Sequence, residues 1–153
     1  MERFMKKSAM GKRFYIGDSF SLSSMGYDDF LYEKPCRSFH VINYFTWHFV
    51  ISGKGRLEMG DKSYNIESGM SFFIPPDTQM RYFPDSSDPW EYVWFDMRGD
   101  MAAEYGLRLG FTAENPVQRI KNFPQIKLIL KKTLQTIDED TCGYYGVLSA
   151  FYK

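Results

Sequence analysis

Short apolar runs separated by turn residues fill the chain between residues 14 and 95. Gly, Pro, Ser and Asp stand between the runs. Closely spaced runs of this kind indicate an all-β sandwich or barrel. The predicted strands are FYI (14–16), YFTWHFVI (44–51), RLEM (56–59), SYNI (63–66), MSFFI (70–74), MRYF (80–83) and WEYVWF (90–95).

The clearest turn joins the third and fourth of these strands. Residues 59–62 read MGDK, and Gly60 can adopt the positive φ that a two-residue hairpin turn needs. We therefore expect residues 56–66 to form a β-hairpin.

The apolar period changes after Gly99. Residues 100–109 predict a short helix that Gly110 ends at a C-cap position. A longer helix is expected from near Pro124, with one apolar face that covers the barrel or a partner subunit. That face consists of Ile126, Ile129, Leu130, Thr133, Leu134 and Ile137. The segment 143–153 also has helical spacing and lacks an end signal, so we expect a longer natural chain.

Composition and charge limit the classes of protein to which the chain can belong. The chain has 153 residues, 44% hydrophobic and 25% charged, which is typical of one globular domain. Its 19 basic residues balance 19 acidic ones, so it lacks the basic surface of a nucleic-acid-binding domain. Cys36 and Cys142 lie outside any CxxC, which favours reduced thiols. The sequence has no secretory signal and no membrane-spanning apolar run, so we expect a cytoplasmic protein.

Three stretches match the pattern of a known family. They are GYDDFLYEKP (26–35), NYFTWHFVISGKGRLEMGDKSYNIESGMSFFIPP (43–76) and DPWEYVWFDMRG (88–99). Gly69, Pro75 and Met80 also follow the spacing of the second cupin motif. Together these stretches resemble the effector-binding domain of AraC-family transcription regulators.

The resemblance implies a mainly β fold, a cupin-like jelly-roll barrel followed by C-terminal helices. We expect an N-terminal arm at 1–13, the effector-binding barrel at 14–98 and a helical dimerisation segment at 99–153. In the family the barrel binds a small molecule, usually a sugar or a similar metabolite. A helix-turn-helix domain, absent from this sequence, binds the DNA. We therefore expect a homodimer through the C-terminal helices that contacts DNA only through that missing domain.

The metal positions of the cupin motifs are poorly filled. A catalytic metal needs about three His or carboxylate ligands that converge on one point. These positions hold His40, Ile42, Thr46 and Met80, and only the histidine among them is a usual metal ligand. We therefore expect no metal and no other cofactor.

Alternation along residues 44–51 places Thr46 and His48 on one face of a strand. By analogy with the metal cupins, this face points into the barrel. A neutral imidazole can donate and accept hydrogen bonds at once, so both residues are candidate effector ligands. The alternative for His48 is a core histidine satisfied by a neighbour.

Trp90, Tyr92 and Trp94 also alternate and share one face of the last strand. A sugar packs its C–H face on an aromatic ring, while indole and phenol groups bond its hydroxyls. In a sugar-binding member of the family, the positions that match Tyr82, Tyr92 and Trp94 contact the sugar, which makes these three candidates. The alternative is a packed sheet surface under the helices. We expect Trp90 to pack outside the barrel or at its rim.

The expected function is effector sensing rather than catalysis, because no nucleophile–base or phosphate-binding motif is present. Two alternatives remain open. One is a small metal-free cupin enzyme, a sugar isomerase or epimerase, for which no acid–base pair stands out. The other is an interaction module that binds no ligand.

Overall fold

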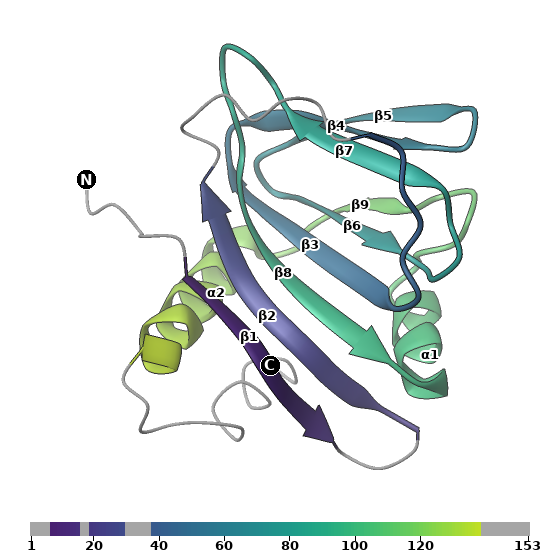
Figure 1. The fold of residues 1–153 in the computed structure, drawn as a ribbon. Helices are drawn as coiled ribbons and strands as arrows, with labels where there is room; N and C mark the ends of the chain where they lie inside the picture. The colour runs from purple at the N-terminus through teal and green to yellow at the C-terminus, as the bar shows by residue number, and fades with distance from the viewer. Residues whose placement is uncertain (1–6, 16–18, 30–37, 139–153) are drawn as a thin grey trace.

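The computed structural model describes residues 7–15, 19–29 and 38–138, so the helix predicted at 143–153 lies outside the described residues. The described strands form two antiparallel sheets (Figure 1). The large sheet contains, in spatial order, β1 (Lys7–Tyr15), β2 (Ser21–Asp29), β8 (Glu91–Arg98), β3 (Phe45–Ser52), β6 (Met70–Ile74) and β9 (Val117–Arg119). The small sheet contains β5 (Lys62–Glu67), β4 (Lys54–Met59) and β7 (Met80–Pro84).

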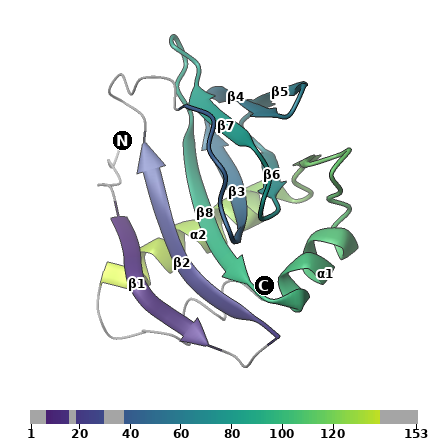
Figure 2. The same cartoon turned by 45° about the vertical axis from the view of Figure 1, so that its right-hand side comes forward.

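Each face of the large sheet has its own buried core. Val50 and Phe72 of the large sheet pack with Leu57 and Ile66 of the small sheet on the inner face. The outer face packs under α1 (Asp100–Arg108) and α2 (Phe123–Asp138). Figures 1 and 2 both show α2 behind β2 and β8. This two-layer arrangement, with helices on one side, is the expected mainly β, cupin-like architecture.

Several predicted elements are confirmed. The hairpin of β4 and β5 turns at Gly60, whose φ is 55°, with Met59 opposite Lys62. α1 ends ahead of Gly110, whose φ of 85° is the left-handed conformation that glycine adopts most readily. α2 begins at Phe123, one residue before Pro124, where the fixed φ of proline suits a first helical turn.

The boundaries predicted for the arm and the barrel need correction. The arm of 1–13 is wrong from Lys7 onward, because β1 pairs with β2 and places Lys7 opposite Tyr27. The barrel also extends past residue 98, because β9 pairs with the edge of β6. A three-residue strand is too short to produce a readable alternation.

β2 was not among the predicted strands. Its register shifts between Leu22 and Ser24, and this irregularity breaks the two-residue period. Leu22, Met25 and Tyr27 therefore all belong to the core under the helices although they are unevenly spaced. The inner face of β2 carries no large apolar residue, so the usual strand signal is weak there.

The apolar face of α2 covers the large sheet of its own chain. Leu130 and Leu134 are buried in the outer core, and Ile126 packs against it. Leu128 points away and is 53% exposed, while the side chain of Ile137 lies outside the description. None of the described helices is long and apolar enough to cross a membrane.

Candidate functional site

A row of polar and aromatic side chains crosses the inner face of the large sheet. It forms because directly opposed residues of neighbouring antiparallel strands point to the same face. β8 lies between β2 and β3, so each inward residue of β8 has a neighbour on both sides. The sets are Asp96 with Ser24 and Thr46, Trp94 with Gly26 and His48, and Tyr92 with Asp28 and Val50.

His48 lies in an aromatic cage and is 2% exposed. Its ring stacks on Phe72 at 4.4 Å between centroids with an interplanar angle of 7°. Edge contacts reach Tyr82 at 5.0 Å and Tyr92 at 4.8 Å. The structure thus brings His48, Tyr82 and Tyr92 together from three strands, as a closed inner wall.

Trp94 continues this wall toward a less buried region. Its ring lies 6.0 Å from that of Tyr92, and its side chain is only half-buried. The six-membered ring of the indole lies directly against Gly26, where an added Cβ would be 2.2 Å from Cζ2. Only glycine leaves room for this approach, which holds the indole on β2.

The prediction that Trp90 packs outside the barrel or at its rim is wrong. Trp90 is fully buried between the sheets, with ring centroids 5.8 Å from both Phe72 and Tyr92. Gly55 of β4 makes this position available, because a Cβ there would be 2.3 Å from Cε3 of the indole. Trp90 therefore holds the two sheets together.

The polar end of the row is organised around Asp96. The Ser24 hydroxyl donates to Oδ2 of Asp96 at 2.5 Å, and the Thr46 hydroxyl also donates to this carboxylate. Thr46 Oγ1 lies 3.5 Å from Nδ1 of His48. The Thr46 hydroxyl thus stands between the Asp96 carboxylate and the His48 imidazole. Thr46 thereby links the carboxylate to His48.

Burial raises the pKa of the Asp96 carboxyl. The hydrogen bonds from Ser24 and Thr46 and the charge of Arg98 act in the opposite direction without cancelling the effect. The Arg98 guanidinium itself donates to the backbone oxygen and to Oδ1 of Asn43, each at 2.9 Å. Asp96 is therefore a partly desolvated carboxylate whose hydrogen-bond donors are two hydroxyl groups.

A hollow of about 390 Å³ opens near the start of β3, beside Arg98. It is lined by Asn43, Tyr44, Phe45, Pro76, Arg98, Gly99, Asp100 and Ala103. Arg98 stands two residues after Asp96 on β8, and Tyr44 stands two residues before Thr46, directly ahead of β3. The hollow thus lies between the ends of β3 and β8 and the start of α1, and neither Trp94 nor Asp96 lines it.

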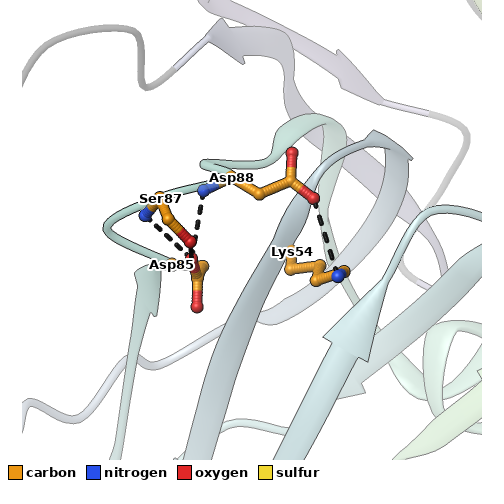
Figure 3. A network of polar contacts seen from close by, with 4 residues as sticks. All are labelled: Lys54, Asp85, Ser87 and Asp88. Carbon is orange, nitrogen blue, oxygen red and sulfur yellow. Dashed lines mark hydrogen bonds and ion pairs between the residues drawn. The ribbon is translucent and has the colours of Figure 1, made fainter.

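The connection that leads into β8 is held by its own polar contacts (Figure 3). Oδ1 of Asp85 accepts from the backbone N–H and the hydroxyl of Ser87 and from the backbone N–H of Asp88. The backbone N–H of Lys54 donates to the Asp88 carbonyl at 2.8 Å, beside a 3.9 Å ion pair of the side chains. These contacts tie the loop to β4 and so fix where Trp90 and the rest of the row begin.

The predicted site residues Thr46, His48, Tyr82, Tyr92 and Trp94 all lie in or beside this row. Sequence reasoning missed Asp96, Ser24 and Gly26. For Asp96 a signal existed, because the alternation through Tyr92 and Trp94 continues to residue 96. Ser24 and Gly26 had none, since the register shift in β2 hides their common face.

Among the described residues, no group of three His, Cys, Asp or Glu side chains could hold a metal ion. His40 lies beside Tyr82, with 6.4 Å between the ring centroids. Its backbone pairs with that of Met80, and its Nδ1 is 3.1 Å from the Ser38 carbonyl oxygen. The donor set in the row consists of hydroxyls, one imidazole and carboxylates, which suits hydrogen bonding to an organic ligand.

Comparison with known proteins identifies relatives of this chain. The sequence profile of the "AraC-like ligand binding domain" family matches residues 30–150. The "Lactose operon transcription activator" of Staphylococcus xylosus is 20% identical over 99% of this chain and 52% of its own length. The "Msm operon regulatory protein" of Streptococcus mutans is 33% identical over 36% of this chain and 20% of its own length. The chain thus spans about half the length of the first relative.

Solved cupin structures are similar at low sequence identity. A cupin protein from Bacteroides fragilis is 13% identical, with a TM-score of 0.46 over 64% of this chain and 80% of its own. An RmlC-like cupin from Methanocaldococcus jannaschii with a double-stranded β-helix fold is 15% identical. Its TM-score is 0.44 over 68% of this chain and 92% of its own.

Proposed function

The chain belongs to the AraC-like ligand-binding domain family, and we propose that it senses a sugar-like effector in the cytoplasm. In this proposal the effector binds on the inner face of the large sheet. Its occupancy controls a DNA-binding domain in the longer natural protein. Regulators of lactose and Msm operons are among the relatives of the chain, which supports a regulatory role.

The observation that carries this proposal is the placement of Trp94. Its half-buried indole is held against Gly26 and stands on the same face as the hydroxyl and carboxylate groups around Asp96. A sugar presents an apolar C–H face together with several hydroxyls. An aromatic ring beside hydrogen-bonding groups matches both features of such a ligand.

The five candidate residues take two different roles in this proposal. Trp94 stacks on the sugar, because its ring is half-buried, and Thr46, which is 4% exposed, meets only the edge of the sugar beside Asp96. His48, Tyr82 and Tyr92 pack against one another and form the inner wall that limits the ligand. Because these three side chains are buried, they can contact the edge of a ligand but cannot stack on its face.

Effector binding acts through a population shift. One arrangement of the sheet and helices holds Trp94 in place and has the highest affinity for the ligand. The bound ligand therefore stabilises this arrangement. α2 packs on the outer face of the strands whose inner face carries the row. We propose that this packing passes the change to a dimer interface beyond α2 and then to the DNA-binding domain.

The alternative of a metal-free sugar isomerase or epimerase rests on the Asp96–Thr46–His48 set, which contains a carboxylate and an imidazole. Both groups bond to the Thr46 hydroxyl, so they are engaged with each other. Binding without conversion is therefore the better supported function. The two functions differ in whether a bound sugar is recovered unchanged.

Calorimetric titration with galactose, glucose, arabinose and lactose tests the proposal. We expect saturable one-site binding of at least one sugar, and NMR of the recovered sugar should show no new isomer. Conversion of the sugar would favour the enzyme. Absence of heat and of thermal stabilisation with every sugar would overturn the sugar-sensing function.

A further inference from the structure

An acidic side chain flanks Trp94 on each side along the inner row. Asp96 follows Trp94 on β8, and Asp28 stands opposite Tyr92 on the other side of the Gly26–Trp94 pair. Asp28 is 5% exposed. Alternation along β2 and β8 directs both carboxylates to the inner face.

The hydrogen bonds at Asp96 leave it as an acceptor of further donors. A carboxylate offers about four lone-pair positions, and the Ser24 and Thr46 hydroxyls use one each. Arg98, the basic residue next along this face of β8, directs its guanidinium at Asn43 and stacks over Tyr44. A ligand beside Trp94 therefore meets an acceptor that can bond hydroxyl hydrogens.

We infer that Asp96 is a specificity-determining residue that selects neutral polyhydroxyl effectors and rejects anionic ones such as uronic acids and sugar phosphates. The inference rests on the proposed sugar-sensing function. Hydroxyls of a neutral sugar donate to the Asp96 carboxylate while the C–H face of the sugar lies on Trp94. A second anion brought into this partly desolvated place is repelled, because charge repulsion strengthens as the surroundings become less polar.

Sugars that share a ring but differ in charge separate the effect of ligand charge on affinity from the effect of ligand shape. The probes are galactose, galacturonate and galactose 6-phosphate, and the corresponding glucose set, titrated calorimetrically into the protein at pH 7. We expect the neutral sugar of at least one set to bind and its anionic partners to bind at least tenfold more weakly. An anionic sugar that binds as tightly as its neutral parent would overturn the inference while leaving the sensing function intact.

Substitution tests the residue itself. Asp96→Asn keeps the shape of the side chain and removes its charge, so we expect at least tenfold weaker binding of the neutral sugar and a smaller gap to the anionic sugars. Asp61→Asn, in the exposed hairpin turn, is the matched control and should change neither value. Unchanged neutral-sugar affinity and selectivity in a folded Asp96→Asn protein would refute the assignment. Failure of all sugars to bind would overturn both this inference and the proposed function.

Discussion

The indole of Trp94 lies against the backbone of Gly26, so closely that a Cβ at residue 26 would fall 2.2 Å from Cζ2. Trp90, two inward positions earlier and directly ahead of β8, lies against Gly55 in the same way, at 2.3 Å. The surroundings of the two indoles differ. Trp94 is half-buried next to polar groups, and Trp90 is enclosed between the two sheets. An indole packed against a glycine thus occurs twice, in the candidate site at one end of β8 and in the core at the other end.

Gly26→Ala and Gly55→Ala should therefore have different consequences. The enclosed Trp90 cannot turn away from a new methyl group, so we expect Gly55→Ala to cost about 1–3 kcal/mol of unfolding free energy. The half-buried Trp94 can turn away, so Gly26→Ala should cost less stability and instead weaken sugar binding. Urea unfolding and calorimetry of both variants measure these effects. A larger loss of stability in Gly26→Ala than in Gly55→Ala would contradict the account.

Trp90 itself should behave as a core residue. Trp90→Ala removes a fully buried indole between the sheets, and we expect it to cost about 3–5 kcal/mol. Trp90→Phe should cost much less, because the indole N–H has no hydrogen-bond partner among the described residues and so no bond is lost. Equilibrium unfolding measures both values. Equal losses in the two variants would contradict the role of the buried ring in packing.

Asp96 should change how the unfolding free energy of the protein depends on pH in the acid range. Because burial raises its pKa, the native state binds more protons than the unfolded state between the unfolded pKa of about 3.9 and the raised native pKa. In that window the contribution of Asp96 to the unfolding free energy falls as pH rises. Asp96→Asn lacks this titration, so the stability of the parent minus that of the variant should fall from pH 3 upward and then level off.

Unfolding of both proteins in urea from pH 3 to pH 8 measures this difference. The lowered pKa values of Asp85 and Glu114 give stability that is lost as pH falls. Both residues are present in parent and variant, so their contributions cancel. Parallel pH profiles for the two proteins would show that burial of Asp96 does not shift its titration.

The packing of α2 gives a prediction about its two sides. Leu134→Ala should cost about 2–5 kcal/mol, because Leu134 is 1% exposed in the outer core. Leu128→Ala, on the exposed side, should stay within about 0.5 kcal/mol. Unfolding at several protein concentrations measures both costs. A concentration-dependent loss in Leu128→Ala would place that leucine in a subunit interface.

The sequence allowed prediction of the parts of the fold in which periodicity and packing agree. Alternation placed Thr46 and His48 on one face of β3, but both faces pack against apolar layers, so the inward direction came from the analogy with the metal cupins. The hairpin at Gly60 and the apolar face of α2 carried equally local signals. β2 could not be found in this way, because a register shift and an inner face of Ser24, Gly26 and Asp28 remove its apolar pattern.

The candidate site was predictable only in part for the same reason. Its aromatic half has strong signals in single strands, whereas its polar half depends on which strands become neighbours. Nothing near Ser24 in the sequence points to Asp96, which is 72 residues away along the chain. Trp90 was misplaced because alternation gives the face of a strand but not which part of that face a second sheet covers. That choice depends on Gly55, a residue of another strand.

The central claim is that a sugar binds on Trp94, and one calorimetric comparison tests it most directly. The same sugar is titrated into the parent, Trp94→Ala and the control Phe39→Ala, which removes a 42% exposed ring over Arg81. A stacked ring contributes about 0.5–1.5 kcal/mol beyond the area it buries, and about 1.4 kcal/mol is one decade of affinity. We expect Trp94→Ala to bind at least tenfold more weakly and Phe39→Ala to bind as the parent does. If Trp94→Ala binds the sugar as tightly as the parent, the effector lies elsewhere and the aromatic row of β8 is only core.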